Sequence, residues 1–188
     1  LFGEFNVYNL LGAMSVAYEL GIDGETIMHA VRKIKAVKGR FSVLHTEKGT
    51  IIVDFAHTPE GLKNLLSTAR TITKSRLITL FGCGGERDKT KRAAMGKIAS
   101  KYSDYIILTS DNPRSEDAFD IIKQIEWGVT IKDVKCIVDR PEAVRFALSE
   151  MEEGDTLVLA GKGNENYLEI KGKKIPYSDF DMIARYAR

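Results

Sequence analysis

Short apolar runs that alternate with amphipathic segments are the feature that most constrains how residues 41–188 can fold. The runs Arg76–Phe81, Tyr105–Thr109, Val134–Val138 and Thr156–Ala160 are predicted to be buried strands, and a segment with apolar residues at helical spacing separates each run from the next. Strands that are joined through helices form parallel sheets with helices on both faces. The sequence therefore predicts an α/β protein with a mainly parallel sheet.

The rest of the sequence predicts further helices, two hairpins and a boundary between two parts. An antiparallel strand is expected at one or both edges of the sheet. We expect Asn6 to cap the first helix and Ser115 to cap the helix that begins at Glu116. The basic connector Val37–Arg40 marks the boundary between a helical appendage and the main domain. The expected helices are 6–20, Glu25–Ile34, Pro59–Thr71, Lys91–Tyr102, Glu116–Trp127, Pro141–Met151 and Asp179–Tyr186, and the expected hairpins pair Ser42–Thr46 with Thr50–Phe55 and Tyr167–Ile170 with Lys174–Tyr177.

Composition narrows the class of protein. With 44% hydrophobic and 29% charged residues, the chain fits a soluble globular protein, and no apolar run is long enough to span a membrane. The net charge of +2, with basic and acidic residues interleaved, argues against a nucleic-acid partner. Cys83 and Cys136 fit no metal-binding spacing and are expected to be reduced thiols in the cytosol. Because the chain starts at Leu1 in the middle of a pattern, we expect it to be part of a longer protein.

The stretch from Thr109 to Arg114 is the first candidate site. It lies at the carboxyl end of a predicted strand, which is where open α/β sheets bind ligands. It combines the carboxylate of Asp111, the amide of Asn112 and the guanidinium of Arg114, and side chains of both charges suit a zwitterion such as an amino acid. Taken alone, the stretch is equally compatible with a polar strand-to-helix turn in which Pro113 fixes φ.

The glycine-rich stretch Gly82–Asp88 follows the preceding strand. Its glycines allow the backbone to approach a ligand closely and to direct successive N–H groups at an anion. Arg87 adds a guanidinium that suits a carboxylate or a phosphate. A purely structural turn would not need the cations that cluster between Arg87 and Arg92, so we favour a functional role. The stretch is neither a Walker A loop nor a complete dinucleotide-binding motif, because Gly-Lys-Ser and Gly-Lys-Thr are absent and Arg87 stands where the third glycine is needed.

A third candidate lies between a predicted strand and the helix that begins near Pro59. Here Asp54 can hold a ribose hydroxyl or can simply accept hydrogen bonds from backbone N–H groups. Thr58 can cap the helix, and a single loop histidine such as His57 is commonplace. For this stretch the structural interpretation is at least as good as the functional one.

Two further charged residues, Glu165 and Arg40, could contact a ligand. Glu165, in the loop Gly161–Tyr167 after the last parallel strand, can receive an ammonium group, although the loop can equally be a flexible surface segment. Arg40 lies at the domain boundary and can reach a phosphate or remain a solvated charge. The sequence shows no hydrolytic nucleophile paired with a base and no metal-ligand cluster.

These stretches occur together in one order over essentially the whole chain. They are Phe5-Asn6-Val7-Tyr8-Asn9, Gly39-Arg40, Asp54-Phe55-Ala56-His57-Thr58-Pro59, Gly82-Cys83-Gly84-Gly85-Glu86-Arg87-Asp88, Asp111-Asn112-Pro113-Arg114 and Ala160-Gly161-Lys162-Gly163. In this combination the chain resembles the Mur ligases, and most of all the branch that adds the third amino acid of the peptidoglycan stem peptide.

The resemblance implies a fold and a reaction. Residues 39–188 would form the C-terminal, Rossmann-like domain, and residues 1–38 the helical tail of a central ATPase domain. In this family ATP phosphorylates a carboxylate, here that of UDP-MurNAc-L-Ala-D-Glu, and the amine of the incoming amino acid then attacks the acyl phosphate. ATP and Mg²⁺ would be required, with the P-loop and the metal ligands outside this chain, so the isolated chain is expected to be inactive. The enzyme would be a cytoplasmic monomer without a nucleic-acid or membrane partner.

The resemblance also implies roles for single residues. The asparagine motif would lie near adenine, and two further residues would meet the phosphates and the ribose; these four are Asn6, Asn9, Arg40 and Asp54. His57 and Thr58 would lie near the reacting centre. The residues that match the pocket for the incoming amino acid are Arg87, Asp111, Asn112, Arg114, Gly161 and Glu165.

The amino acid itself is predicted from the Asp-Asn-Pro-Arg motif, which in this family accompanies meso-diaminopimelate, whereas altered versions accompany lysine. The chemistry agrees, because Arg114 and Arg87 suit a distal carboxylate while Asp111 and Glu165 suit the ammonium group beside it. A lysine-adding ligase and a non-catalytic module that binds amino acids or nucleotides are the alternatives. The motif argues against the related folylpolyglutamate synthetases.

Three departures from the family pattern bear on the pocket. Asn164 stands where a histidine is usual, and Ala118 stands where a proline is usual. Ala93 follows Arg92 where proline is common, which is a milder change. Glu165 is kept, so the pocket is expected to be intact, with its detailed geometry altered.

Overall fold

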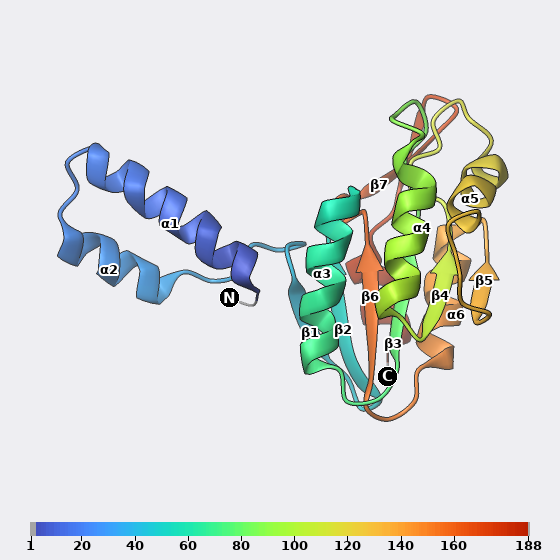
Figure 1. Ribbon diagram of the computed structural model, residues 1–188, viewed down its shortest axis with the longest axis horizontal. Coiled ribbons are helices and arrows are strands. Elements are labelled where there is room, and N and C mark those ends of the chain that lie inside the picture. Colours follow the sequence, from blue (N-terminus) through green and yellow to red (C-terminus); the bar gives the residue numbers. More distant parts are fainter. Residues whose placement is uncertain (1–2, 188) are drawn as a thin grey trace. The chain divides into compact units, whose positions relative to one another are not determined.

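The computed structural model describes residues 3–187. The chain divides into two compact units, Leu1–Val37 and Lys38–Arg188 (Figure 1). Leu1, whose place in the sequence pattern is discussed above, lies outside the described residues. The first unit holds helices α1 (Glu4–Glu19) and α2 (Gly24–Lys33), and the side chain of Asp23 caps α2 by accepting from Thr26 N–H at 2.9 Å.

Asn6 does not cap the first helix, contrary to the sequence prediction. Helix α1 begins at Glu4, with Gly3 at the N-cap position, so Asn6 lies within the first turn. Asn9 lies one turn further along the same side of the helix, with its Nδ2 at 3.5 Å from Asn6 Oδ1.

The second unit is built on a six-stranded sheet with the strand order β1-β2-β6-β3-β4-β5. All neighbouring strands are parallel except β1, which pairs antiparallel with β2 at one edge. The predicted mainly parallel sheet with an antiparallel edge is therefore confirmed. The strands are β1 (Ser42–His45), β2 (Gly49–Asp54), β3 (Leu77–Phe81), β4 (Tyr105–Leu108), β5 (Val134–Cys136) and β6 (Asp155–Ala160).

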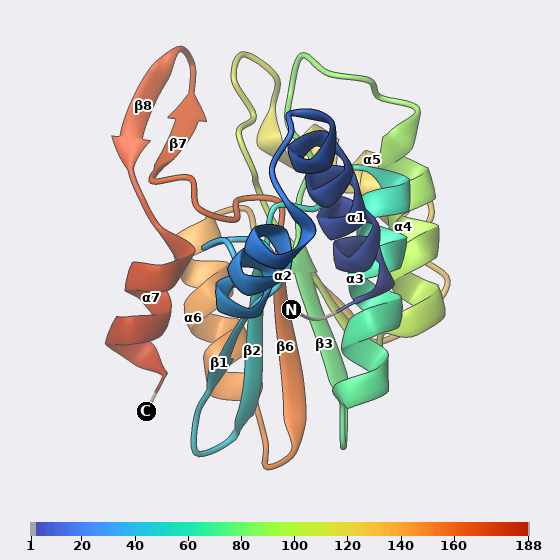
Figure 2. The same ribbon diagram turned by 90° about the vertical axis from the view of Figure 1, so that its left-hand side faces the viewer.

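Helices cover both faces of this sheet, as predicted (Figure 2). Helices α3 (Pro59–Ile72), α4 (Lys91–Tyr102) and α5 (Ala118–Glu126) lie on one face, and α6 (Arg140–Glu150) and α7 (Asp179–Tyr186) lie on the other. The order of the strands explains the division. The chain moves outward from β2 through β3 and β4 to β5 and then returns to β6, and because such crossovers are right-handed, the return helix falls on the opposite face.

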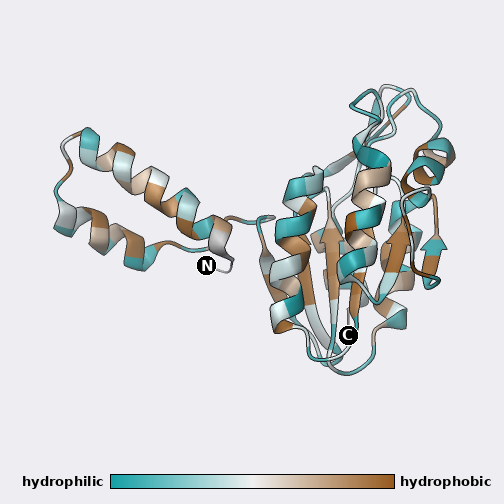
Figure 3. Cartoon of the chain, viewed as in Figure 1, coloured by the Kyte–Doolittle hydropathy of each residue, from teal (hydrophilic) through white to brown (hydrophobic). Residues whose placement is uncertain are grey.

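The core consists of two apolar layers that sandwich the sheet (Figure 3). Alternate strand residues such as Ile51, Leu80 and Leu159 pack against the buried side chains of α6 and α7. The opposite layer includes buried side chains of α3, α4 and α5, among them Leu66 and Met95. Central strands buried on both faces are rigid supports for the loops that leave their carboxyl ends.

A separate two-stranded hairpin, β7 (Tyr167–Ile170) and β8 (Lys173–Pro176), follows β6 and does not extend the main sheet. It is attached instead to the loop after β4. Arg114 N–H donates to Glu169 O at 3.1 Å, and Lys171 N–H donates to Arg114 O at 2.7 Å. The hairpin therefore fixes the backbone of the Asp-Asn-Pro-Arg stretch from one side.

The cap of α5 also differs from the prediction. Asp117, and not Ser115, caps this helix, with its Oδ1 accepting from Phe119 N–H at 2.8 Å and from Asp120 N–H at 3.2 Å. The Ser115 hydroxyl instead bonds to the carboxylate of Glu86 across the neighbouring loop. The helix starts later than expected because residues 113–116 are used to join two loops.

A buried ion pair connects the ends of several elements beneath these loops. The Arg140 guanidinium donates to both carboxylate oxygens of Asp179, at 3.0 and 2.8 Å, and to Ala160 O at 3.2 Å and Ser110 O at 3.4 Å. Burial acts to lower the pKa of Arg140, but the Asp179 carboxylate outweighs it, so the pKa lies above its usual value. Tyr177 OH donates to Asp179 Oδ1 at 2.6 Å, and burial raises the pKa of this hydroxyl. Arg140 thus holds the carboxyl ends of β4 and β6 in place.

Candidate functional site

The carboxyl ends of four neighbouring strands meet at one edge of the sheet and surround a cavity of about 690 Å³. The loops after β2, β6, β3 and β4 supply its walls, because parallel strands end on the same side. All eight residues predicted for the reacting centre and the amino-acid pocket line this cavity: His57, Thr58, Arg87, Asp111, Asn112, Arg114, Gly161 and Glu165. Segments that lie more than a hundred residues apart in sequence are thus brought together as the motifs indicated.

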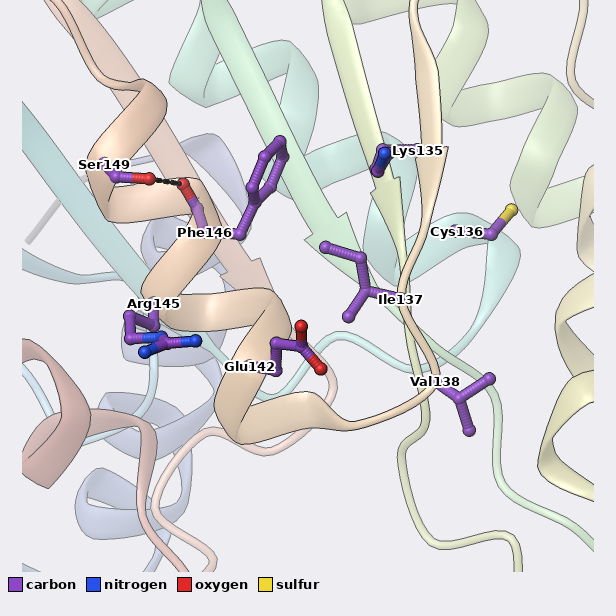
Figure 4. A pocket seen from close by; sticks show the side chains of 8 residues that line it. All are labelled: Lys135, Cys136, Ile137, Val138, Glu142, Arg145, Phe146 and Ser149. Carbon is purple, nitrogen blue, oxygen red and sulfur yellow. Dashed lines mark hydrogen bonds between the residues drawn. The ribbon is translucent and has the colours of Figure 1, made fainter.

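A second cavity of about 740 Å³ has a different character (Figure 4). It lies between β5 and α6, where Ile137 and Phe146 face one another beside Lys135 and Arg145. None of the predicted site residues lines it. Its position beside the edge strand, away from the loops that follow β2, β3 and β6, makes it useful as an internal control for the first cavity.

A compact cluster of charged and polar groups forms one wall of the first cavity. Lys162 Nζ donates to Asn112 Oδ1 and to Glu165 Oε2, both at 2.8 Å, and lies 3.5 Å from Asp111 Oδ1. Asn112 Oδ1 also accepts from Glu169 N–H at 2.9 Å, so its Nδ2 is left to donate to Glu165 Oε2 at 3.1 Å. These bonds fix the orientation of the Asn112 amide and of both carboxylates.

Lys162 was missed by the sequence analysis, which treated it only as part of the Gly161–Gly163 motif. Its side chain is 0% exposed, and its ammonium lies 5.3 Å from the centre of the Tyr167 ring. A lysine two residues after the end of a fully buried strand, followed at short range by Glu165, is the signal that could have been used. Buried ammonium groups require paired carboxylates, and this stretch and Asp111 provide them.

Two guanidinium groups line the same cavity, those of Arg87 and Arg114. Arg114 adopts φ of 53°, donates from Nη1 to Gly85 O at 2.6 Å, and forms an ion pair from Nε to Glu169 Oε2 at 3.3 Å. These contacts hold its planar group at the cavity wall. Within residues 3–187, no hydrogen bond or ion pair engages the side chain of Arg87, which is exposed and lines the same cavity. Arg87 is therefore available to an anionic ligand.

The glycines of the Gly82–Asp88 loop serve loop-to-loop packing. A Cβ at Gly82 would lie 2.2 Å from Thr109 O, and a Cβ at Gly85 would lie 2.0 Å from Pro113 O. Gly85 N–H already donates to Asn112 O at 2.9 Å. The close approach that the glycines were predicted to allow is therefore, at these positions, an approach to the loop after β4. Burial raises the pKa of Cys83 to about 12, so its thiol stays protonated.

A second ion pair clamps the same two loops together. The fully buried Arg92 donates to both oxygens of Glu116, at 3.0 and 3.1 Å, and Glu86 N–H also bonds to Glu116. The Arg92 hydrogen bonds and the Glu86 N–H lower the pKa of Glu116 to about 2. This clamp, which the sequence analysis did not identify, maintains the spacing between Arg87 and Arg114 on their two loops.

The residues predicted to meet the nucleotide are not on the cavity wall. Asp54 is buried and accepts from Phe41 N–H at 2.6 Å and from Ala56 N–H at 2.7 Å, as the structural interpretation anticipated. Burial raises the pKa of Asp54, and the two N–H donors oppose this effect. Arg40 lies over the Phe55 ring, 4.5 Å from its centre. Asn6 and Asn9 belong to α1, in the other unit.

The two residues predicted for the reacting centre lie at the start of α3. Thr58 caps this helix, with Oγ1 accepting from Gly61 N–H at 3.1 Å. His57 Nδ1 lies 2.9 Å from Phe55 O, and the His57 carbonyl accepts from Lys91 Nζ at 2.8 Å. The Lys91 contact ties the loop after β2 to α4 and so closes one side of the cavity.

This geometry suits a ligand with a carboxylate and an ammonium group close together. Guanidinium groups bind a carboxylate through two parallel hydrogen bonds, and carboxylates accept from an ammonium group. The residues from 3 to 187 contain no group of three or more His, Cys, Asp and Glu side chains that could hold a metal ion. Among the helices of this same range, none combines the length and the apolar character that crossing a bilayer requires.

Comparison with known proteins identifies the family. Residues 39–163 match the model of the Mur ligase glutamate ligase domain, and the chain therefore belongs to the Mur ligase family. It is 47% identical over 97% of its length to a UDP-N-acetylmuramoyl-L-alanyl-D-glutamate–2,6-diaminopimelate ligase of Aquifex aeolicus and 46% identical over 100% to one of Syntrophomonas wolfei. It covers 38% and 39% of these two relatives, so it spans about two fifths of their length.

Solved structures give the same result. A structure of a UDP-N-acetylmuramoyl-L-alanyl-D-glutamate–2,6-diaminopimelate ligase superposes with a TM-score of 0.78 and 36% sequence identity, covering 100% of this chain and 39% of that one. The predicted Rossmann-like α/β fold and the predicted resemblance to the Mur ligases are both confirmed.

Proposed function

We propose that this chain is the part of an ATP-dependent amide-forming ligase that binds meso-diaminopimelate and presents it for addition to UDP-MurNAc-L-Ala-D-Glu. The observation that carries the proposal is the cavity at the strand ends, which is lined by both guanidinium groups and a carboxylate cluster. The names of the relatives at 46–47% identity support the same substrates. The proposal concerns the whole ligase as well as this chain, because the chain covers only part of those relatives.

The two ends of the amino acid are proposed to make different contacts in the cavity. The distal carboxylate of meso-diaminopimelate binds Arg114 and Arg87, and its distal ammonium binds Glu165 and Asp111. The amine at the other end stays free of these contacts and points out of the pocket. Lysine lacks the distal carboxylate, so it leaves the two guanidinium groups without an anionic partner. The lysine-adding alternative is therefore disfavoured by the charge of the pocket.

The free amine then reacts with the activated substrate. ATP phosphorylates the glutamyl carboxylate of UDP-MurNAc-L-Ala-D-Glu, and the amine attacks the carbonyl carbon of the acyl phosphate. A tetrahedral intermediate forms, the C–O bond to phosphate breaks, and the amine loses a proton as the amide forms. The pocket contributes mainly by orienting the amine toward that carbon. His57 and Thr58, on the cavity wall, are proposed to lie beside the reacting atoms.

The nucleotide is proposed to contact residues outside the cavity. Asn6 and Asn9 would meet adenine, while Arg40 and Asp54 would meet the phosphates and the ribose. Asp54 already accepts two backbone hydrogen bonds, and its carboxylate retains acceptor capacity for a ribose hydroxyl. The described residues do not fit a magnesium site of their own, so the Mg²⁺ ligands are proposed to come from outside this chain.

Three further assignments belong to the same proposal. Residues 1–38 are the tail of the central ATPase domain, and residues 39–188 are the C-terminal domain. The whole ligase is a cytoplasmic monomer that needs neither nucleic acid nor a membrane. The 188-residue chain alone does not form the amide, although it binds the amino acid, because every residue of the proposed pocket lies in its second unit.

Binding to the isolated chain tests this proposal. Titration of the ¹⁵N-labelled chain with meso-diaminopimelate should shift the backbone signals of the loops around Arg114 and Glu165, and lysine should bind at least tenfold more weakly. Arg114→Met should weaken meso-diaminopimelate strongly and lysine little. Arg145→Met, in the cavity between β5 and α6, removes the same charge and should change neither affinity. A preference for lysine, or shifts confined to the β5–α6 cavity, would overturn the proposal.

A further inference from the structure

Lys162 occupies a position that the proposed ligand contacts do not explain. It is 0% exposed, and it reaches Asp111, Asn112 and Glu165, which are three of the pocket residues. An ammonium group supplied by the protein therefore already lies among the carboxylates that are proposed to receive the ammonium of the ligand. The question is what this internal cation does for binding.

The contacts of Lys162 divide each carboxylate into an anchored and an unused oxygen. Asp111 turns Oδ1 toward Lys162, and Glu165 turns Oε2 toward both Lys162 and Asn112. Among the described residues, no hydrogen bond engages Asp111 Oδ2 or Glu165 Oε1. Both residues line the cavity, so one oxygen from each remains for a ligand.

The net charge of the cluster also indicates that it can accept one ligand ammonium group. Two carboxylates and one ammonium leave this wall of the cavity with one net negative charge, which matches a single ligand ammonium. Without Lys162, this wall would carry two neighbouring negative charges and would favour a ligand with more positive charge. The cluster is thus balanced for a ligand that brings one ammonium and one carboxylate to this end.

We propose that Lys162 is a positioning residue, which orients the two carboxylates and limits this wall of the cavity to one net negative charge so that a zwitterionic end is preferred over a cationic one. The inference deepens the proposed function and rests on it for the identity of the ligand. Lys162 does not need to touch the amino acid. It acts through Asp111, Asn112 and Glu165.

Lys162→Met tests the charge while keeping most of the side-chain volume. We expect the ratio of the dissociation constants for lysine and meso-diaminopimelate to fall about tenfold, because the added negative charge favours the cationic ligand. Lys174→Met is the matched control. Lys174 Nζ lies 4.3 Å from the Tyr167 ring centre on the exposed hairpin, and its loss removes the same charge without changing the carboxylate cluster. It should leave the ratio unchanged.

The double variant Lys162→Met/Glu165→Gln separates a charge effect from a packing effect. It restores one net negative charge, so the ratio should return toward the wild-type value even though total affinity falls. If Lys162→Met fails to fold, the double variant still tests the charge effect, because it has fewer unpaired buried charges and should fold more readily. A ratio that stays at the wild-type value in Lys162→Met, or that is not restored in the double variant, would contradict the inference.

A measurement without ligand keeps this inference separate from the proposed function. The side-chain amide signals of Asn112, followed by ¹⁵N NMR, should move in Lys162→Met and stay in place in Lys174→Met. If the wild-type chain binds neither amino acid, the proposed function fails, and these signals still decide whether Lys162 positions the cluster. Unchanged Asn112 signals in a folded Lys162→Met variant would overturn the positioning role.

Discussion

Arg140 and Lys162 are both fully buried cations, and they lie on adjoining parts of the fold. The Arg140 guanidinium shares two hydrogen bonds with the single carboxylate of Asp179, so that pair is electrically balanced. Lys162 is surrounded by two carboxylates, and its cluster keeps an excess negative charge on the wall of a cavity. The two cations are equally buried, but the net charge of their surroundings differs.

From this difference we infer that the Arg140–Asp179 pair supports the fold, whereas the Lys162 cluster is available for ligand recognition. A balanced pair closed off from solvent, such as Arg140 with Asp179, has no charge left for a ligand, and its contacts to Ser110 O and Ala160 O hold two strand ends together. An unbalanced cluster that borders a cavity is incomplete until a ligand charge arrives. Arg92 with Glu116 is intermediate, because this carboxylate is partly exposed and also forms an ion pair with the exposed Lys89 at 3.4 Å. Four predictions test this ordering.

The largest effect is expected from Asp179→Asn. This change leaves the guanidinium of Arg140 buried without its anion, so the free energy of unfolding should fall by about 3–5 kcal/mol. Urea unfolding followed by circular dichroism at neutral pH measures the loss. Asp181→Asn, at an exposed position of the same helix, should cost far less. Equal losses for the two variants would show that the buried pair has no special role.

Glu116→Gln should have the next largest effect, about 2 kcal/mol, because it removes the charge that neutralises buried Arg92. The prediction also has a pH signature. The folded-state pKa of Glu116 is lowered from 4.5 to about 2, so its contribution is complete above about pH 4.5 and is lost as the pH falls toward 2. The variant should therefore lose less stability than the wild type over that interval.

Unfolding experiments between pH 2 and pH 7 measure this difference. Glu47→Gln is the matched control, since Glu47 is exposed on the turn between β1 and β2. The control should follow the wild-type pH dependence. If Glu116→Gln also follows the wild-type pH dependence, then ionisation of Glu116 beside Arg92 does not stabilise the fold.

Lys162→Met should cost less stability than Asp179→Asn, roughly 1–2 kcal/mol. The carboxylates it leaves behind border a cavity open to water, whereas Arg140 has no such access. Adding meso-diaminopimelate should raise the melting temperature of the wild type more than that of the variant. A loss as large as that of Asp179→Asn would mean that the Lys162 cluster supports the fold as the Arg140–Asp179 pair does. The distinction between the two sites would then fail.

Thr58→Ala should have the smallest effect, about 1 kcal/mol, through loss of the cap of α3. Thr58→Ser keeps the hydroxyl and should retain nearly full stability. In a complete ligase, the proposed location beside the reacting atoms predicts a fall in kcat for Thr58→Ala beyond what the stability loss explains. Full activity in a stably folded Thr58→Ala variant would limit Thr58 to its role as a cap.

Much of the fold and the outline of the site could be predicted from the sequence. The alternation of apolar runs with helical segments defined the parallel sheet, and residues after strand ends had to gather at one edge. Asp111, Arg114 and Glu165 were identified in this way. The helix α4 and the terminal helix α7 were also placed with their observed ends.

What escaped prediction depends on contacts between distant segments. Lys162 is buried because Asn112, fifty positions earlier, accepts from it, and no local pattern reveals that partner. Ser115 was a plausible cap by its position, but its hydroxyl bonds to Glu86 on another loop. Asn6 was likewise a plausible cap, but the N-cap position is Gly3, three residues earlier. Tertiary partners decided the cases of Lys162 and Ser115 over local preference.

The most direct test is a crystal structure of the chain soaked with meso-diaminopimelate. We predict that the distal carboxylate of the ligand binds Arg114 and Arg87, that its distal ammonium lies between Asp111 Oδ2 and Glu165 Oε1, and that Lys162 keeps its three contacts. The second amine should point away from the cluster. A ligand ordered in the cavity between β5 and α6, or one bound at the strand ends with its ammonium toward Arg114, would contradict the account.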